Sequence, residues 1–163
     1  MARTIAVLLP AGAEAKTTSF PAPGRTSDAS GARPYLGFAV GEATAWTLVV
    51  PQGFSGPITA LITYAMASAT ANAVEWRVEV EAISDGDALD TDASESFDSV
   101  NDSGDVTVPG TAGHIDQVSL AATNGDSAAA GDMLRIRLTR TTPAGTSASG
   151  DANVYVVELR DAA

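Results

Sequence analysis

The chain has 163 residues, no cysteine and a formal net charge of −11. The length suits one domain that buries its own core, and the lack of cysteine excludes disulfides and thiolate metal sites. Nucleic-acid binding through a basic face is excluded by the acidic composition, and no apolar run is long enough to span a bilayer.

The N-terminal segment differs from the rest in charge and pattern. Residues 1–40 hold four basic and two acidic residues, a net of +2, so the remainder carries −13. After a short strand predicted at residues 4–9, residues 10–34 are rich in proline, glycine and small polar residues without periodicity. We therefore predict an extended N-terminal arm over residues 1–43, packed either on its own domain or across a neighbouring subunit.

The arm is the predicted partner-binding element, because it carries the positive charge and one isolated aromatic. Phe20 lies between polar residues and prolines, as expected of an anchor for a pocket on another chain. If this is right, a chain lacking residues 1–34 should still fold but should no longer assemble. The predicted partner-binding residues are Arg3, Lys16, Phe20, Arg25 and Arg33.

From residue 35 onward the pattern is that of strands. Residues 72–83 alternate apolar and charged side chains, with Trp76 on the apolar side. Similar runs, separated by turn residues, predict an all-β fold: a two-sheet antiparallel β-sandwich of jelly-roll type over residues 44–163. The predicted strands are residues 35–40, 46–51, 57–66, 72–83, 106–109, 115–122, 133–140 and 154–159.

Charged residues on two of these strands have matching period-2 spacing. Arg135 and Arg137 share one face of their strand. On the other strand, one face carries Glu75, Arg77, Glu79 and Glu81. Cross-strand ion pairs between these two faces are the predicted arrangement.

An acidic loop is the strongest candidate metal site. Residues 85–105 contain eight acidic residues and no Lys or Arg, and Ca²⁺ binds carboxylate oxygens. The spacing departs from an EF-hand loop, so a solvated loop whose acids cap turns is the main expectation, with calcium as the alternative cofactor. The calcium candidates are Asp85, Asp87, Asp90 and Asp92.

No catalytic residue is predicted. His114 is the only histidine, and Asp116 shares its strand face. A hydrolase needs a nucleophile and a base oriented by a third group, and no such motif surrounds His114. We expect a surface histidine and a protein that is not an enzyme.

A family resemblance lies in several short segments. These are residues 46–51, Tyr64, and residues 68–70, 72–76, 85–90, 109–111, 130–140, 151–152 and 156–159. Together they resemble a β-sandwich domain of tailed-phage and metagenomic virion proteins, over roughly residues 44–160. A short domain with an arm and no fibrous repeat is most similar to capsid decoration (cement) proteins.

The resemblance implies a structural role on the exterior of a phage head. The implied partner is the major capsid protein. A homotrimer is expected because oligomers favour closed symmetry and a trimer suits jelly rolls and icosahedral threefold positions. No membrane and no nucleic acid is expected to bind. Two alternatives remain: a receptor- or glycan-binding module of a fibre or tail, and a lectin-like domain that uses calcium at the acidic loop.

Overall fold

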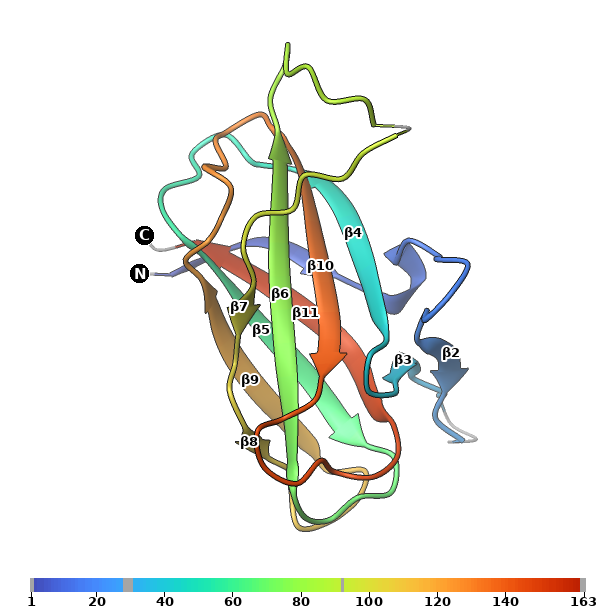
Figure 1. Cartoon of the computed structure of the whole chain (residues 1–163). Helices are drawn as coiled ribbons and strands as arrows, with labels where there is room; N and C mark the ends of the chain where they lie inside the picture. Colours follow the sequence, from blue (N-terminus) through green and yellow to red (C-terminus); the bar gives the residue numbers. More distant parts are fainter. Residues whose placement is uncertain (1, 28–30, 92, 162–163) are drawn as a thin grey trace.

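The computed structural model describes residues 2–27, 31–91 and 93–161, and in them eleven strands form two antiparallel sheets (Figure 1). Sheet A contains β1 (Arg3–Leu8), β2 (Ala22–Arg25), β3 (Pro34–Phe38), β5 (Ile58–Met66), β9 (Ile115–Ala122) and β11 (Ala152–Asp161). Sheet B contains β4 (Ala43–Val49), β6 (Ala73–Ile83), β7 (Asn101–Asp102), β8 (Val106–Thr107) and β10 (Met133–Thr141). A short 3-10 helix, η1 (Pro10–Gly12), follows β1.

The strand order is that of a jelly roll. Sheet A runs β3-β11-β5-β9 and sheet B runs β4-β10-β6-β7, with β2 added beside β3. From β3 to β6 each connection crosses to the other sheet, β7 stays with β6, and β9 to β11 alternate again. Eight strands in two such sheets define the jelly roll, so the predicted fold class is confirmed.

The core lies between the sheets and is built by period-2 alternation. On β10, Leu134, Ile136 and Leu138 are fully buried while the residues between them face outward. Trp76 on β6 is also fully buried, and its ring meets those of Phe38 and Tyr64 edge-on at 5.5 Å. Trp76 therefore joins the inner faces of both sheets, as expected of a large aromatic in a sandwich core.

The N-terminal segment belongs to the sandwich, which corrects the expected division between residues 43 and 44. β1 pairs with residues 157–161 of β11, with Arg3 opposite Asp161, and β3 pairs with residues 152–154 of the same strand. These strands satisfy the backbone hydrogen bonds along one edge of β11. Deleting residues 1–34 would expose that edge, so this deletion does not isolate an independent domain.

Within the described residues, no helix has both the length and the apolar character needed to cross a membrane.

Candidate binding groove

On the outer face of sheet B, two arginines of β10 and two glutamates of β6 form a ladder of ion pairs. Arg135 lies directly opposite Glu81 and Arg137 opposite Glu79 in the β10–β6 register, with N–O distances of 2.7 and 2.5 Å. The predicted cross-strand ion pairs are therefore confirmed. The hydrogen bonds that Arg137 donates to Glu79 raise the pKa of Arg137 above its usual value, so this guanidinium stays charged.

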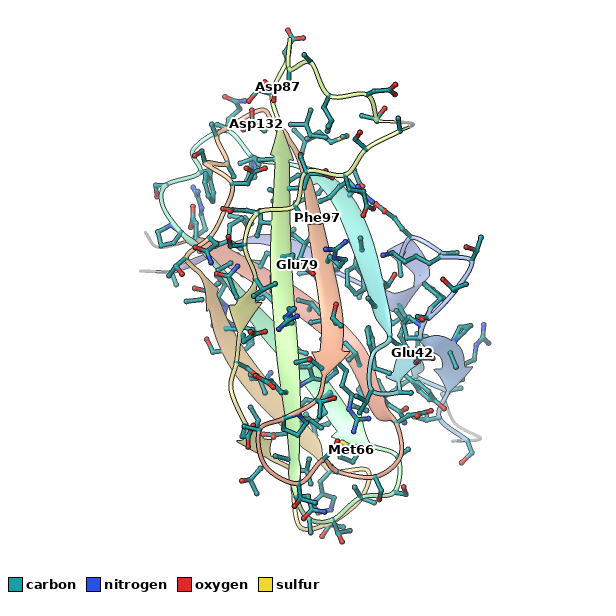
Figure 2. The ribbon with its side chains drawn as sticks, viewed as in Figure 1. Glu42, Met66, Glu79, Asp87, Phe97 and Asp132 are labelled. Carbon is teal, nitrogen blue, oxygen red and sulfur yellow. The ribbon has the colours of Figure 1, made fainter. Side chains whose placement is uncertain are left out.

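The long connection after β6, residues 84–100, is fastened to this ladder. Glu95 accepts hydrogen bonds from both arginines at 3.2 Å, and the ring of Phe97 lies 4.1 Å from the guanidinium carbon of Arg137. Phe97 and Glu79 lie over β6 and β10 in Figure 2. Arg135 and Arg137 are thus occupied by contacts that also hold the chain's own loop.

The outer face of sheet A has a different composition. None of the residues that β5 and β9 turn outward carries a charge, and Ile115 among them is 57% exposed. On β11 the outward residues Glu158 and Arg160 pair with each other at 2.6 Å. The outward residues of β5 and β9 are Thr59, Leu61, Thr63, Ala65, Ile115, Gln117, Ser119 and Ala121.

A β-bulge turns a tyrosine onto this face. Val154 pairs with Tyr64 and Val156 with Thr63, so Tyr155 is an extra residue between two registered pairs. The buried positions of β11 change parity across it, as a bulge that re-aims side chains requires. The Tyr155 ring meets that of Tyr35 edge-on, with centroids 6.0 Å apart.

Tyr155 lines a groove of about 640 Å³ over this part of the sheet. Its walls are η1, the end of the β2–β3 hairpin and the start of β9, and they are mostly apolar. It continues into a hollow of about 280 Å³ beside Arg25 and Tyr35. The larger part is lined by Leu9, Pro10, Ala11, Thr26, Arg33, Pro34, Gly113, Ile115 and Tyr155.

The groove has the size and lining of a binding site. Protein sites for small ligands usually enclose about 300–1,000 Å³, with apolar walls and a few polar groups. The polar groups here are Thr26, Arg33 and the Tyr155 hydroxyl. Burial and the neighbouring Tyr35 raise the pKa of Tyr155, while Arg33 opposes the shift. The phenol therefore keeps its proton at neutral pH and can donate a hydrogen bond.

Arg25 and Arg33, two of the five predicted arm residues, come together at this groove. They are exposed near the end of the β2–β3 hairpin, and each lines one part of the groove. The hairpin is closed by two bonds: the Thr26 N–H donates to the Arg33 carbonyl at 3.0 Å, and the Arg33 N–H donates to the Thr26 hydroxyl at 2.9 Å.

The other three predicted arm residues lie elsewhere. Arg3 forms an ion pair with Asp161 at 2.5 Å. Glu14 forms an ion pair with Arg135 of sheet B. Arg135, and more weakly the nearby Lys16, lower the pKa of Glu14. Phe20 is half-buried and packs against the chain's own core, and its role as an anchor for a partner remains a prediction.

The acidic loop after β6 contains the predicted calcium residues. Asp85, Asp87 and Asp90 are exposed, and an Asp87 carboxylate oxygen accepts a hydrogen bond from the Ser84 N–H at 2.8 Å, capping the turn. Asp92 lies outside the described residues. In the part of the chain that the structure describes, no three His, Asp or Glu side chains are grouped to hold a metal ion. Calcium binding remains a prediction.

His114 and Asp116 do not form a pair. His114 is exposed, and the carboxylate of Asp116 instead accepts a hydrogen bond from the Tyr64 hydroxyl at 3.0 Å. Burial, followed by this contact, raises the pKa of Tyr64. Asp116 therefore satisfies a buried phenol at the edge of the core.

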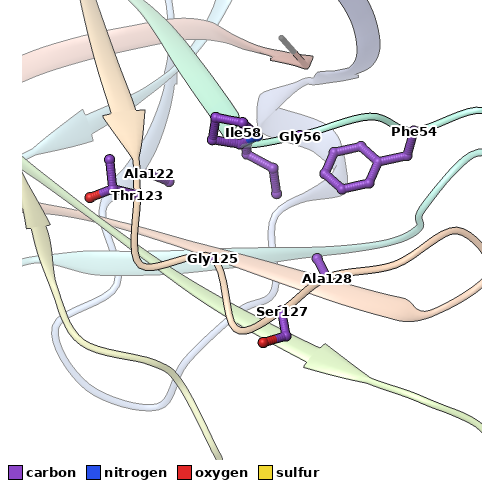
Figure 3. A pocket seen from close by; sticks show the side chains of 9 residues that line it. Phe54, Gly56, Ile58, Ala122, Thr123, Gly125, Ser127 and Ala128 are labelled. Carbon is purple, nitrogen blue, oxygen red and sulfur yellow. The ribbon is translucent and has the colours of Figure 1, made fainter. Parts of the chain in front are cut away.

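A second hollow of about 490 Å³ lies at one end of the sandwich, between the loops that follow β4 and β9 (Figure 3). Phe54 and Ser127 face it from opposite loops, and no charged residue lines it.

Asp126 and Ser127 have φ of 50° and 53°, in the left-handed region. Hydrogen bonds from the Ala82 N–H to Asp126 and from the Asp126 N–H to Asp98 hold this conformation, so it has a structural cause.

No protein-family model and no curated protein sequence matches the chain. Similar solved structures include a carbohydrate-binding module of Cellvibrio mixtus lichenase 5A in complex with cellotriose, at 12% identity and TM-score 0.49 over 99% of this chain and 100% of that one. A family 35 carbohydrate-binding module of Clostridium thermocellum has 16% identity and TM-score 0.45, over 99% and 92%. A xylan-binding module has 12% identity and TM-score 0.47, over 96% and 97%. The fold of the present chain is assigned from its own strand order.

Proposed function

We propose that this chain is a non-catalytic structural module of a virion that decorates the exterior of a tailed-phage head. Its partner is the assembled major capsid protein, and it acts without a cofactor. The part of the outer face of sheet A that lies beyond the groove, over β5 and β9, is the surface that meets the shell. The phage assignment is supported by the residues of 44–160 that resemble virion β-sandwich domains.

The observation that carries the proposal is the contrast between the two outer faces. A chain of net charge −11 has one sheet face on which β5 and β9 present no charge, with Ile115 exposed at its edge. The centres of protein interfaces are depleted of charged residues, and exposed apolar patches mark interaction sites. The acidic surfaces elsewhere keep the outward side of a bound module soluble.

The mechanism of stabilisation is selective binding. A protein that binds the assembled shell and not the free subunits lowers the free energy of the assembled state. A rigid sandwich suits this role because binding its preformed face orders little additional chain.

Copy number in the virion tests this function. Quantitative mass spectrometry on purified virions should give a ratio to the major shell protein near unity or a simple fraction such as one third. A handful of copies per particle would instead identify a tail or fibre component. Absence from virions would overturn the virion role altogether.

The groove supports a second candidate, a receptor- or glycan-binding module of a fibre or tail. The groove of about 640 Å³ offers the Tyr155 ring with Arg33 and Thr26 beside it, the mixture found in small-ligand sites. Calorimetric titration with neutral and carboxylated oligosaccharides would test it. Binding that Tyr155→Ala abolishes would support this candidate, and no heat with any sugar would reject it.

A further inference from the structure

An acidic turn projects from the molecule far from the groove. In the acidic turn, residues 84–87, the Asp87 N–H donates to the Ser84 carbonyl at 3.2 Å, and an Asp87 carboxylate oxygen caps the Ser84 N–H at 2.8 Å. Asp85 and Asp87 are exposed on either side of Gly86, whose φ is 91°. The turn extends beyond the end of β6 in Figure 1. Two bonds therefore preorganise a narrow tip flanked by carboxylates.

The acidic turn cannot fill the groove of its own chain. The connection that follows it is fastened to the outer face of sheet B through Glu95 and Phe97. The groove lies over the outer face of sheet A, between η1 and the β2–β3 hairpin. Because the turn extends beyond the end of β6 and the connection after it is held on sheet B, we assign a contact between the turn and the groove to two molecules.

Charge and shape make the two features complementary. Arg25 and Arg33 edge the groove and its extension, in a segment of net +2 on an otherwise acidic chain. A guanidinium binds a carboxylate through matched pairs of hydrogen bonds. Gly86 has no side chain and Ala88 a small exposed one, so the tip adds little bulk beside its two carboxylates.

We propose that the groove of one copy receives the acidic turn of a second copy of this chain. The carboxylates of Asp85 and Asp87 meet Arg25 and Arg33, and Ala88 packs between Leu9 and Ile115. The contact uses different surfaces on the two partners, so it is heterologous and closes into a ring when the rotation permits. It deepens the proposed function by naming how neighbouring modules join on the shell.

Charge reversal and its rescue test the contact. The groove variant is Arg25→Glu with Arg33→Glu, and the turn variant is Asp85→Arg with Ala88→Arg, which spares the capping Asp87. A swapped variant combines all four changes. The control carries Ala67→Arg, Thr70→Arg and Ala71→Arg, which add a similar charge at exposed positions in the β5–β6 connection. Circular dichroism confirms that each variant is folded.

Sedimentation velocity on the full purified chain, at low and high salt, gives the readout. We expect the wild type and the control to form a closed oligomer that high salt weakens. The groove and turn variants should dissociate at least tenfold more readily, and the swapped variant should recover the oligomer. A monomeric wild type, an oligomer indifferent to both variants, or no recovery in the swapped variant would overturn the proposal.

The outcome is separable from the proposed function. A chain that is monomeric in solution but present at shell stoichiometry in virions would overturn the groove contact and leave decoration intact. Groove variants that keep the oligomer but lose affinity for a carboxylated oligosaccharide would also overturn it, in favour of a glycan in the groove.

Discussion

Arg140 in β10 donates a hydrogen bond to the carbonyl oxygen of Phe38 in β3, 2.9 Å away, and so connects sheet B to sheet A. The same guanidinium donates to the carbonyls of Ala148 at 2.6 Å and Gly150 at 2.5 Å. Arg140 is 1% exposed, and burial lowers its pKa. A buried cation is retained here because three backbone carbonyls, one in β3 and two in the β10–β11 connection, solvate it.

Replacing this arginine should destabilise the whole fold. Arg140→Leu leaves three carbonyls without their donor, and each buried unsatisfied group costs about 1–3 kcal/mol. We expect a loss of about 3 kcal/mol or more in the free energy of unfolding, measured by urea denaturation. The control is Arg77→Leu, because the partly exposed Arg77–Asp102 pair should contribute about 1 kcal/mol or less. Equal losses in both variants would contradict the assigned role of Arg140.

Tyr64 should make the fold sensitive to alkaline pH. Burial first, and then its hydrogen bond to Asp116, raises the pKa of Tyr64, so the folded state holds the phenol proton more tightly than the unfolded chain does. Its contribution is complete below the ordinary tyrosine pKa of about 10 and is lost as the pH rises above it. The stability advantage of wild type over Tyr64→Phe should therefore shrink from about pH 8 to about pH 11. A stability difference that does not change with pH would count against this assignment. As a control, both proteins should also carry Tyr155→Phe, which removes the other tyrosine whose pKa is raised.

Phe97 should govern the opening of the connection at residues 84–100. Phe97→Ala removes the ring that lies 4.1 Å from Arg137 and 5.1 Å from Arg135, contacts worth about 0.5–1 kcal/mol each. We expect faster amide hydrogen exchange across residues 84–100 with little change in the core strands. Phe54→Ala, at the other loop cluster, is the matched control and should leave these amides unchanged. Uniformly faster exchange in β6 and β10 would show that Phe97 supports the sheet itself.

The outer face of sheet A should be sensitive to a single charge. Ser119→Arg places a cation on the proposed shell-binding face, at an exposed β9 residue outside the groove, whereas Val49→Arg places one at a 65% exposed residue of sheet B. We expect Ser119→Arg to weaken binding to purified shells by about tenfold or more, equivalent to about 1.4 kcal/mol. Val49→Arg should bind normally, and the reverse order of effects would move the contact to sheet B.

Period-2 alternation was sufficient for most of the sandwich. It predicted β9 with its observed ends, and it predicted cross-strand ion pairs between the faces of β10 and β6, whose register then places Arg135 opposite Glu81 and Arg137 opposite Glu79. The burial of Arg140 could have been predicted, because it lies on the same side of its strand as Leu134, Ile136 and Leu138. A charged residue on the apolar side of a strand indicates a buried cation with backbone partners.

The groove was less accessible to sequence reasoning. β2 contains Pro23 and Gly24, which are depleted in strands, so no strand was predicted there. The bulge at Tyr155 depends on pairing with β5, and one strand's sequence does not state its register. Arg25 and Arg33 were singled out for their charge alone, and only the hairpin between β2 and β3 brings them to the tyrosines.

The pairing of Arg3 with Asp161 has a consequence for engineering. Because the first and last strands are neighbours, peptide tags or cargo fused at either end would emerge at one point on the rim of the sandwich. A short linker could join the two ends, and new termini could be opened in the exposed connection between β5 and β6. Such a permuted chain would keep every strand pair of the jelly roll and carry its fusion partner on the opposite pole.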